Sequence, residues 1–508
     1  MDLRVQQASV TEIDTPLLVV NLFEGVAPPR GDTALVDTAL GGQISRLIAD
    51  GEISGEPATV TVIHNSGSGL KARRVAVVGL GKESDSQLDR LENIRVAAAL
   101  AARKADDLKL DSFATVVHGA PSNGFSVEDA ARAVMESSIL ALYRYEQFKE
   151  ATRSKHEVKS LTVIAGDSNH DQLEGLAELA RITCDAVMKV RNLSVGPSNF
   201  VTPTYLSEQA RAVAGQYGLE ITVWGKDELR AHGMNAILAV NQGSALPPAF
   251  VVMRYKAAGT ATKTLAVVGK GITFDSGGIS IKHADGMEYM RHDMTGAATV
   301  IGFIQLAAAG KLPVNVVGVF AATENLPSGS AYKPGDVFKA YNGKTMEIVN
   351  TDAEGRVILS DSLAYAAEQK PDAIVDFATL TGACQVALGD HATGLMSNNQ
   401  ALADRLLAAG EKSGDRCWQL PLWKVYGEQI KTAMADVRNT GGRRAGAITA
   451  GLFLQEFVGD VPWVHLDIAG TAYADGDQTY VAPYNPKPGA TGVGVRLLWH
   501  FCQAWKDE

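Results

Sequence analysis

The chain has little cysteine, few aromatic residues and no long hydrophobic run, and each shortage excludes a class of protein. Its 4 cysteines are scattered and form no CxxC pair, which excludes a disulfide framework and a thiolate zinc site. An aromatic share of 6% argues against a membrane protein or one that stacks on carbohydrate. The longest apolar stretches, such as Leu17–Leu22, are far shorter than the roughly 20 residues that span a bilayer.

The chain also has no excess of positive charge. Lys and Arg number 47 against 57 Asp and Glu, so the 508 residues carry a formal net charge of −10. Such a surface has no overall attraction for phosphate backbones, which disfavours a nucleic-acid partner without excluding a local basic patch. The N-terminal residues show no apolar run followed by a small-residue cleavage site. We therefore expect a cytoplasmic protein with no membrane partner.

Short apolar runs alternate with longer helical patterns along the whole chain, which is typical of α/β proteins. The long helical pattern that ends before Gly196-Pro197 marks a domain boundary, because these residues interrupt a helix. We predict a smaller N-terminal α/β domain at 1–170, a linker helix at 171–193, and a larger C-terminal domain at 194–508. The C-terminal domain should have a mainly buried central sheet flanked by helices, since its strands are almost entirely apolar.

The predicted elements are as follows. Strands are predicted at Pro16–Leu22, Val60–His64, Arg74–Val78, Ser112–Val117, Ser160–Ala165, Thr264–Val268, Val314–Ala321, Ala373–Thr379 and Trp463–Asp467. Helices are predicted at Leu35–Ala49, Gln87–Lys104, Val127–Tyr145, Asp171–Arg191, Thr295–Ala309, Arg356–Gln369 and Gly446–Phe457.

Charged residues occur where buried strands of the C-terminal domain end. The glycine-rich run Val268–Gly278 follows one such strand and carries Lys270 and Asp275. In open α/β sheets ligands bind beyond the carboxyl ends of the strands, so this run is a candidate site. The alternative interpretation is a simple ion pair between Lys270 and Asp275 that caps the sheet.

Further acids precede two predicted helices. Asp293 stands just before an alanine-rich helix, where an ordinary helix N-cap is the alternative interpretation. Asp352 and Glu354 lie two apart in Asn350–Arg356, so in extended backbone both side chains leave the same face. A helix dipole would stabilise one or two acids at the helix N-terminus, but it does not explain a charged segment that also contains Arg356.

Convergence of these acids would require cations. The carboxylates of Asp275, Asp293, Asp352 and Glu354 would repel one another strongly in a poorly solvated cleft. Two divalent ions would balance the charge if Lys270 were neutral and ligated through its nitrogen. Oxygen ligands with one nitrogen suit Zn²⁺, Mn²⁺ or Mg²⁺. The sequence contains no HExxH motif, which argues against a mononuclear zinc protease.

Two further cationic residues have candidate roles beside such ions. Lys282, if it remains charged, could stabilise the oxyanion of a tetrahedral intermediate; a solvated surface lysine is the alternative. Arg356 could hold a small anion together with the N–H groups of the helix start.

The heptapeptide Asn350–Arg356 resembles the signature of the leucyl (cytosol) aminopeptidases, the dinuclear metallo-exopeptidases of the M17 type. The resemblance extends over further segments in the expected order: Asn192–Leu206, Val268–Gly278, Met290–Ala297, Thr379–Ala383, His465–Thr471 and Gly489–Arg496. The first 170 residues fit the variable N-terminal domain of that family by length and by strand–helix alternation only.

The resemblance implies a role for each matched residue. One metal ion would be held by Lys270, Asp275, Asp293 and Glu354, and the other by Asp275, Asp352 with its backbone carbonyl, and Glu354. Lys282 would polarise the scissile carbonyl, and Arg356 would anchor a bicarbonate ion that serves as general base. The backbone around Ala353, Gly355 and Leu380 would complete the anion site, and Met290, Thr379 and Gly382 would line the pocket for the first side chain.

The resemblance also implies an activity. The chain would be a metal-dependent aminopeptidase that removes leucine-like residues from peptides with a free N-terminus. Its cofactors would be two divalent ions per chain, Mn²⁺ or Zn²⁺ with Mg²⁺ or Co²⁺ as further candidates, and bicarbonate. Members resemble one another in forming homohexamers of two stacked trimers. The chain departs from the usual family pattern at His283, Arg291 and His292, none of which is a ligand position.

Two other interpretations remain at this stage. Another dinuclear hydrolase, such as a phosphoesterase, would also use carboxylates and two ions, but it would recruit histidine ligands or several arginines. Alternatively, the hexamer could bind DNA or another protein independently of catalysis. Arg73-Arg74 and Arg443-Arg444 are the candidate contacts for such a role, against the alternative of ordinary solvated charges.

Overall fold

The computed structural model describes residues 1–67, 69–119, 126–165, 170–259 and 261–506. The chain divides into two compact units, which are described separately. The smaller unit contains Met1–Asp185 and Thr479–Pro486, and the larger contains Ala186–Gln478 and Lys487–Glu508. Both units combine a sheet with helices, which confirms the predicted α/β class. The sequence-based division at residues 170 and 193 remains a prediction.

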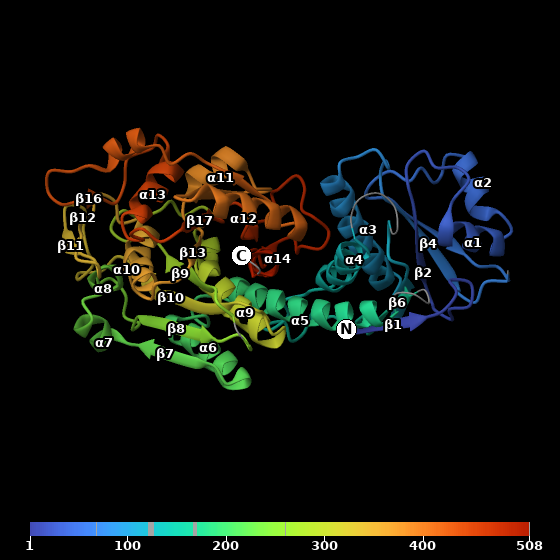
Figure 1. The fold of residues 1–508 in the computed structure, drawn as a ribbon, viewed down its shortest axis with the longest axis horizontal. Coiled ribbons are helices and arrows are strands. Elements are labelled where there is room, and N and C mark those ends of the chain that lie inside the picture. Colours follow the sequence, from blue (N-terminus) through green and yellow to red (C-terminus); the bar gives the residue numbers. More distant parts are fainter. Residues whose placement is uncertain (68, 120–125, 166–169, 260, 507–508) are drawn as a thin grey trace. The chain divides into compact units, whose positions relative to one another are not determined.

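The smaller unit is built on a six-stranded sheet in the order β1-β6-β5-β2-β4-β3, drawn in blue and cyan in Figure 1. Neighbouring strands are parallel except for the antiparallel pair β3 and β4. Its strands are β1 (Asp2–Gln7), β2 (Leu18–Leu22), β3 (Val60–His64), β4 (Arg74–Gly79), β5 (Ser112–Thr115) and β6 (Ser160–Ala165). Its helices are α1 (Gly31–Ala39), α2 (Gln43–Ala49), α3 (Gln87–Asp107) and α4 (Val127–Ala141). The helix α5 (His170–Val195) begins in this unit and continues into the larger one.

The single helix predicted at Leu35–Ala49 is wrong. The segment forms two helices, α1 and α2, separated by a break at Gly41 and Gly42. Both glycines adopt positive φ, 65° and 81°, a conformation that a right-handed helix cannot contain and that glycine adopts readily.

The larger unit is built on an eight-stranded sheet in the order β15-β14-β17-β13-β9-β10-β8-β7. The central strands β17, β13, β9 and β10 are parallel to one another. The strands are β7 (Glu220–Trp224), β8 (Ala249–Tyr255), β9 (Thr264–Asp275), β10 (Asn315–Asn325), β13 (Ala373–Ala378), β14 (Thr393–Ser397), β15 (Cys417–Gln419) and β17 (Trp463–Asp467). Two small sheets consist of β11 (Val337–Lys339), β12 (Thr345–Glu347) and β16 (Val437–Arg438), and of β18 (Tyr473–Ala474) and β19 (Gly489–Ala490).

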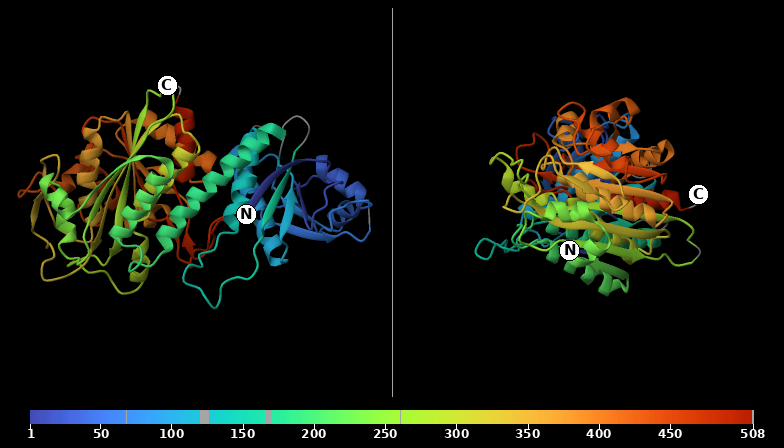
Figure 2. Two further views of the ribbon diagram at one scale, coloured as in Figure 1. Left: turned by 90° about the horizontal axis from the view of Figure 1, so that it is seen from below. Right: turned by 90° about the vertical axis from the view of Figure 1, so that its left-hand side faces the viewer.

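Helices cover both faces of this sheet, as Figure 2 shows from the side. On β10, Val317 and Val319 belong to the core that contains α10 and α13, whereas Gly318 faces Val300 and Ile304 of α9. Successive side chains of a strand point to opposite faces, so these helices cover opposite sides. The helices are α6 (Pro203–Tyr217), α7 (Lys226–Ala231), α8 (Asn235–Asn241), α9 (Thr295–Ala309), α10 (Glu354–Glu368), α11 (Gly382–Leu388), α12 (Gln400–Ser413), α13 (Gly446–Gln455) and α14 (Val495–Trp505), with the 3-10 helices η1 (Met287–His292) and η2 (Lys424–Ile430).

The strand β9 is longer than predicted and contains the first half of the glycine-rich run. It continues through Lys270 to Asp275, so Lys270 lies inside the strand rather than at its end. Gly269 and Gly271 permit this because carbonyl oxygens of Gly296 and Ala321 occupy the space where their Cβ atoms would lie. The glycines therefore allow close packing of backbone on backbone.

No helix among the described residues is long and apolar enough to cross a membrane.

Candidate metal centre

The site lies at the carboxyl ends of the parallel strands in the larger unit. Asp275 is the last residue of β9, and Thr379 and Asp467 stand at the ends of the neighbouring strands β13 and β17. Asp293 follows η1 and lies two residues before the start of α9, and Glu354 is the first residue of α10. Parallel strands bring their carboxyl ends to one edge, which is where α/β sheets bind ligands.

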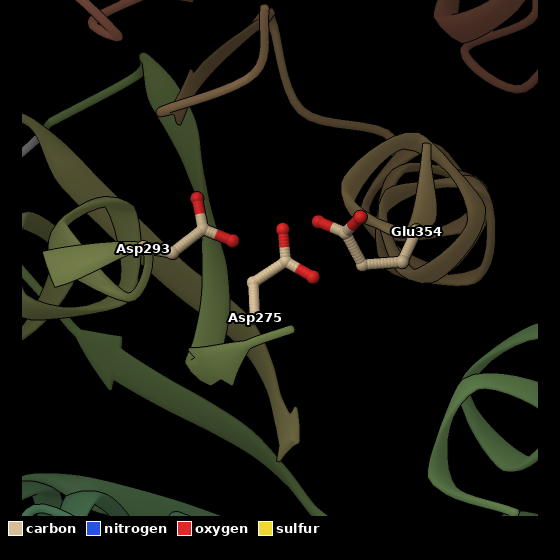
Figure 3. A group of neighbouring side chains, drawn as sticks. All are labelled: Asp275, Asp293 and Glu354. Carbon is tan, nitrogen blue, oxygen red and sulfur yellow. The ribbon is translucent and has the colours of Figure 1, made fainter. Parts of the chain in front are cut away.

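Three of the predicted carboxylates converge in the interior. One oxygen each from Asp275, Asp293 and Glu354 lie within 4.8 Å of one another. Figure 3 shows the three side chains pointing toward one another, with the carboxylate of Asp275 between the other two. All three residues are buried, with exposed fractions of 2%, 4% and 1%.

Both predicted lysines are paired with these acids. Nζ of Lys270 lies 2.7 Å from Oδ1 of Asp293 and 2.8 Å from Oε1 of Glu354. It also donates a hydrogen bond to the carbonyl of Thr379 at 3.0 Å. Among the described residues, Lys270 and Asp275 form no ion pair with each other, so the simple cap of the sheet is wrong.

Lys282 is neither free nor fully solvated. Its Nζ lies 2.8 Å from Oδ2 of Asp275 and also pairs with Oδ1 of Asp352. The side chain of Asp352 is 31% exposed, so the fourth carboxylate lies at the solvent side of the cluster. Lys282 thereby links the buried acids to the acid nearest the solvent.

The N-cap interpretation of Asp293 is wrong as well. The N-cap of α9 is Met294, and no side chain caps this helix. Instead Oδ1 of Asp293 accepts a hydrogen bond of 2.7 Å from the hydroxyl of Thr379.

The free oxygen atoms of the cluster fit a bound cation. Oδ2 of Asp293 and Oε2 of Glu354 are buried and have no hydrogen-bond partner among the described residues. A buried carboxylate oxygen without a partner is costly, since no water replaces the lost solvation. A divalent ion bound by oxygen atoms would satisfy both.

The pKa values of the cluster residues also favour a bound cation. Burial, reinforced by the neighbouring acids, raises the pKa of Asp293 well above its usual value, although Lys270 opposes the shift. Burial also raises the pKa of Asp352 to about 6. Burial disfavours the charge on Lys270, but Asp293, Glu354 and Asp275 outweigh it and raise the lysine pKa. A divalent ion would reverse these shifts, because it favours carboxylate anions and a neutral amine.

Several polar residues that orient the acids were not singled out by the sequence. Oδ1 of Asp275 accepts hydrogen bonds from the Gly277 backbone at 2.9 Å and from Nδ2 of Asn325 at 2.8 Å. Asn325 ends β10, the strand beside β9, so it is positioned by sheet pairing. In the sequence, only its place at the end of an apolar strand indicates that Asn325 could belong to the site.

Asp467 orients the loop after β13. Its Oδ1 accepts from the backbone N–H of Leu380 at 3.1 Å, and its Oδ2 accepts from the hydroxyl of Thr381 at 2.6 Å. The N–H of Leu380, predicted to lie at the anion site, is therefore already bonded. The signal for Asp467 was an acid at the end of an apolar strand, within the matched segment His465–Thr471.

Arg356 lies buried beside the cluster. Its Nη1 donates to the carbonyl of Asn439 at 2.9 Å, while its Nε has no partner among the described residues. Burial lowers the pKa of Arg356 to about 10. The side-chain Oδ1 of Asn439 accepts from the backbone N–H of Val349 at 2.8 Å. Asn439 thus holds the arginine through its backbone carbonyl and the turn before Asp352 through its side chain.

Ala353 and Gly355 flank the first residue of α10. Ala353 is the N-cap of the helix, with no side-chain cap. A Cβ on Gly355 would lie 2.5 Å from Cε and 2.7 Å from Nζ of Lys270. Glycine is therefore required for Lys270 to reach Glu354.

A cavity of about 290 Å³ opens over the cluster. It contains the predicted pocket residues Met290, Thr379 and Gly382 beside the acids and lysines. The remaining wall is formed by Gly286, Tyr289, His292, Leu380, Thr381, Gln385, Ala469, Tyr473 and Asp475. His292 stacks on Tyr473, with ring centroids 4.9 Å apart.

The chain is similar to known proteins over almost its whole length. Residues 188–499 match the family described as "Cytosol aminopeptidase family, catalytic domain", and residues 19–152 match its N-terminal domain. The chain is 45% identical over 494 residues to a probable cytosol aminopeptidase of Roseiflexus castenholzii, covering 97% of this chain and 96% of the relative. It is 44% identical over 505 residues to a probable cytosol aminopeptidase of Geobacter sp., covering 99% of both chains.

Solved structures of similar proteins share the fold. A mutant of tomato leucine aminopeptidase matches with a TM-score of 0.87 and 30% identity, over 99% of this chain and 96% of that one. The bottromycin maturation enzyme BotP in complex with Mn matches with a TM-score of 0.84 and 31% identity, over 97% and 100%.

Proposed function

Because the chain belongs to the cytosol aminopeptidase family, and is thus a metal-dependent aminopeptidase acting on peptides, we propose that it removes leucine-like residues by a two-metal mechanism. The observation that carries the proposal is the buried cluster of Asp275, Asp293 and Glu354, in which two carboxylate oxygens lack any described partner. The similar enzyme BotP has been solved in complex with Mn, which supports a metal-dependent reaction.

We propose that the cluster holds two divalent ions. Lys270, Asp275, Asp293 and Glu354 would hold one, and Asp275, Glu354 and Asp352 with its backbone carbonyl would hold the other. Asp275 and Glu354 would therefore serve both ions. The central position of Asp275 in the cluster supports this assignment. Mn²⁺ and Zn²⁺ are the preferred candidates, and Mg²⁺ and Co²⁺ also suit oxygen-rich sites.

The residues around the ions would supply the rest of the chemistry. When bound, the ions activate a water and polarise the scissile carbonyl, and bicarbonate accepts a proton. Lys282 would stabilise the developing oxyanion, since it carries its charge at the edge of the cluster. Arg356 would hold the bicarbonate through the guanidinium face that the protein leaves unpaired at Nε, with the backbone around Ala353, Gly355 and Leu380.

The cavity over the cluster would receive the N-terminal residue of the peptide. Met290, Thr379 and Gly382 would line the pocket for its side chain. The free α-amine would face the acids, so a blocked N-terminus should not be accepted.

The proposal is tested by substrate choice in the presence of Mn²⁺. Leu-p-nitroanilide should be hydrolysed, whereas its N-acetyl derivative and p-nitrophenyl phosphate should not. Equal rates on the acetylated and free substrates would refute the proposed binding mode. Hydrolysis of the phosphate ester alone would favour the phosphoesterase, which the scarcity of arginine in the cluster disfavours.

We further propose that the protein forms a homohexamer and acts in the cytoplasm. Large apolar side chains of the larger unit are exposed on the segment 418–434, among them Trp423 at 65% and Met434 at 68%. Such exposure is typical of an interaction surface. The relatives are named cytosol aminopeptidases, which supports the location. Light scattering on the purified protein tests the hexamer.

The alternative role, binding of DNA or another protein independently of catalysis, is tested with the Asp352→Ala, Glu354→Ala double variant. Binding of DNA or protein by this variant would support that role.

A further inference from the structure

A second cavity adjoins the first on the larger unit. It has a volume of about 610 Å³, within the range of roughly 300–1,000 Å³ that is usual for small-molecule sites. Asp352, Leu380, Thr381 and Gly382 line both cavities. The two cavities therefore meet at the edge of the carboxylate cluster, where the proposed function puts the scissile bond.

The second cavity is mostly apolar. Val386 is 90% exposed on its wall, and Leu420 and Ile448 line it further. Together these side chains form an apolar wall that the side chain of a bound substrate could cover. Since the first cavity would take the N-terminal residue, the part of the substrate left to cover this wall is the portion that departs after cleavage.

The charged side chains of the second cavity include one more base than acid. Its lining contains only three charged side chains: Asp352, Arg356 and Arg443. Asp352 is engaged with Lys282 at the cluster, and Arg356 is buried against Asn439. Arg443 is exposed and forms no ion pair with any carboxylate that the structure describes. An uncompensated cation thus faces an apolar cavity, although the whole chain has a net charge of −10.

The backbone fixes where Arg443 stands. The loop begins after Asn439, which is fully buried and bonded to the turn before Asp352. It ends at Ala445, the N-cap of α13, which adopts an unusual positive φ of 53°. The loop between these two anchors is short, and Thr440 and Gly442 line the cavity beside Arg443, which places Arg443 at the rim.

We propose that Arg443 binds the C-terminal carboxylate of dipeptides and tripeptides, which makes short peptides with a free C-terminus the preferred substrates. This inference rests on the proposed function, because it takes the scissile bond to lie at the carboxylate cluster. Arginine suits the role because its guanidinium donates two parallel hydrogen bonds to a carboxylate. The apolar wall would contact the side chain of the second residue. A peptide advances about 3.3–3.6 Å per residue, so the carboxylate of a longer peptide would pass beyond the rim.

The experiment compares the free acid with its amide. Leu-Leu, Leu-Leu-amide and Leu-p-nitroanilide are assayed with the Mn²⁺-loaded wild-type enzyme and with Arg443→Gln. The wild type should prefer the acid over the amide by about three- to tenfold in kcat/KM, in line with one partly exposed charge-assisted pair. The difference should lie in KM, because binding at the carboxylate does not change during the reaction. Arg443→Gln should remove the preference and leave hydrolysis of Leu-p-nitroanilide unchanged.

Two matched variants complete the design. Arg444→Gln removes an equally exposed neighbour that does not line the cavity, and it should keep the wild-type preference. Arg443→Lys retains the positive charge but not the planar guanidinium group, so it should keep part of the preference for the acid over the amide. The preference should also shrink at high ionic strength.

The outcomes separate this inference from the function on which it rests. Equal rates for acid and amide in the wild type, or a preference that survives Arg443→Gln, would overturn it. An equal loss on all three substrates in Arg443→Gln would also contradict it, since that pattern indicates a structural defect. Failure of the wild type to hydrolyse Leu-p-nitroanilide would instead refute the proposed function, because this substrate has no carboxylate.

Discussion

At the scale of single residues, the cost of buried charge determines what the site can be. Asp275, Asp293 and Glu354 are almost fully buried, and the two nearby lysines bond to only some of their oxygens. A buried ionised carboxylate is stable only when it is paired or bound to a metal. The oxygens that remain unpaired are therefore the atoms available to bind a cation.

Replacement of Glu354, which we propose serves both ions, should disable the site. Glu354→Ala should lower kcat/KM by more than about 100-fold, because removing a ligand costs more than the loss of an outer partner of a ligand. The variant should also lose at least one ion per chain by elemental analysis. Glu368→Ala, on the exposed side of the same helix α10, should keep both ions and full activity. Full metal content in Glu354→Ala would refute the bridging assignment.

A buried histidine in the smaller unit makes stability depend on pH. His118 is fully buried, and burial lowers its pKa from 6.5 to about 4. The unfolded chain therefore binds the proton more readily, so His118 contributes stability that is present above pH 6.5 and is lost as the pH falls toward 4. The loss should reach roughly 3 kcal/mol at 1.4 kcal/mol per pH unit.

Urea unfolding of the full chain at pH 7 and pH 4 measures this effect. At each pH the unfolding free energy of the wild type is compared with that of His118→Leu. This difference should change by roughly 3 kcal/mol between pH 7 and pH 4. His64→Leu, which changes an exposed histidine on β3, should show no such shift. Parallel pH profiles of wild type and His118→Leu would contradict the assignment.

The acids could be predicted from the sequence, but their partners could not. Asp275, Asp293 and Glu354 each follow or precede an apolar element, and each resembles a family position. Asn439 and Asp467 bond to residues more than 80 positions away, such as Asn350 and Leu380. Contacts of this kind depend on which strands pair, and local sequence does not determine that pairing.

At the scale of elements, glycine determines how closely the strands and helices approach. β6, α9 and β17 have the bounds that the sequence predicts, because apolar periodicity and flanking turn residues define them. The errors occur at glycines. Gly41 and Gly42 break a predicted helix, whereas Gly269 and Gly271 let β9 run on through a predicted loop. Glycine is compatible with both outcomes, and only the packing around it decides between them.

The contact between α9 and the sheet provides a direct test. A Cβ on Gly296 would overlap the carbonyl oxygen of Phe377 and lie 2.6 Å from the backbone nitrogen of Lys270. Backbone atoms cannot rotate away, so Gly296→Ala should destabilise the protein by about 3 kcal/mol or more. Because α9 begins two residues after Asp293, the affinity for Mn²⁺ should fall as well.

Gly215→Ala is the matched control for this prediction. Gly215 lies on the exposed side of α6 with nothing within 4 Å of its missing Cβ. Alanine there should be neutral or stabilising by about 0.5–1 kcal/mol, as expected for a helix interior. Thermal unfolding of both variants measures the contrast, and equal stability of the two would contradict the packing argument.

At the scale of the whole molecule, the larger unit carries every residue assigned to the reaction, and the smaller unit carries none. The motifs that carry the family resemblance accordingly lie from residue 192 onward, whereas the first 170 residues fit by length and strand–helix alternation only. The acidic net charge does not exclude local electropositive sites. The second cavity, with Arg356 and Arg443 in its lining, is one.

The most direct measurement is the metal content per chain, determined by elemental analysis together with leucine release from an unblocked dipeptide. The protein is stripped with a chelator, reloaded with Mn²⁺ and assayed at each stage. The account predicts two ions per chain in the reloaded protein, loss of leucine release on stripping, and its return on reloading. Undiminished release from protein that retains less than a tenth of an ion per chain would contradict it.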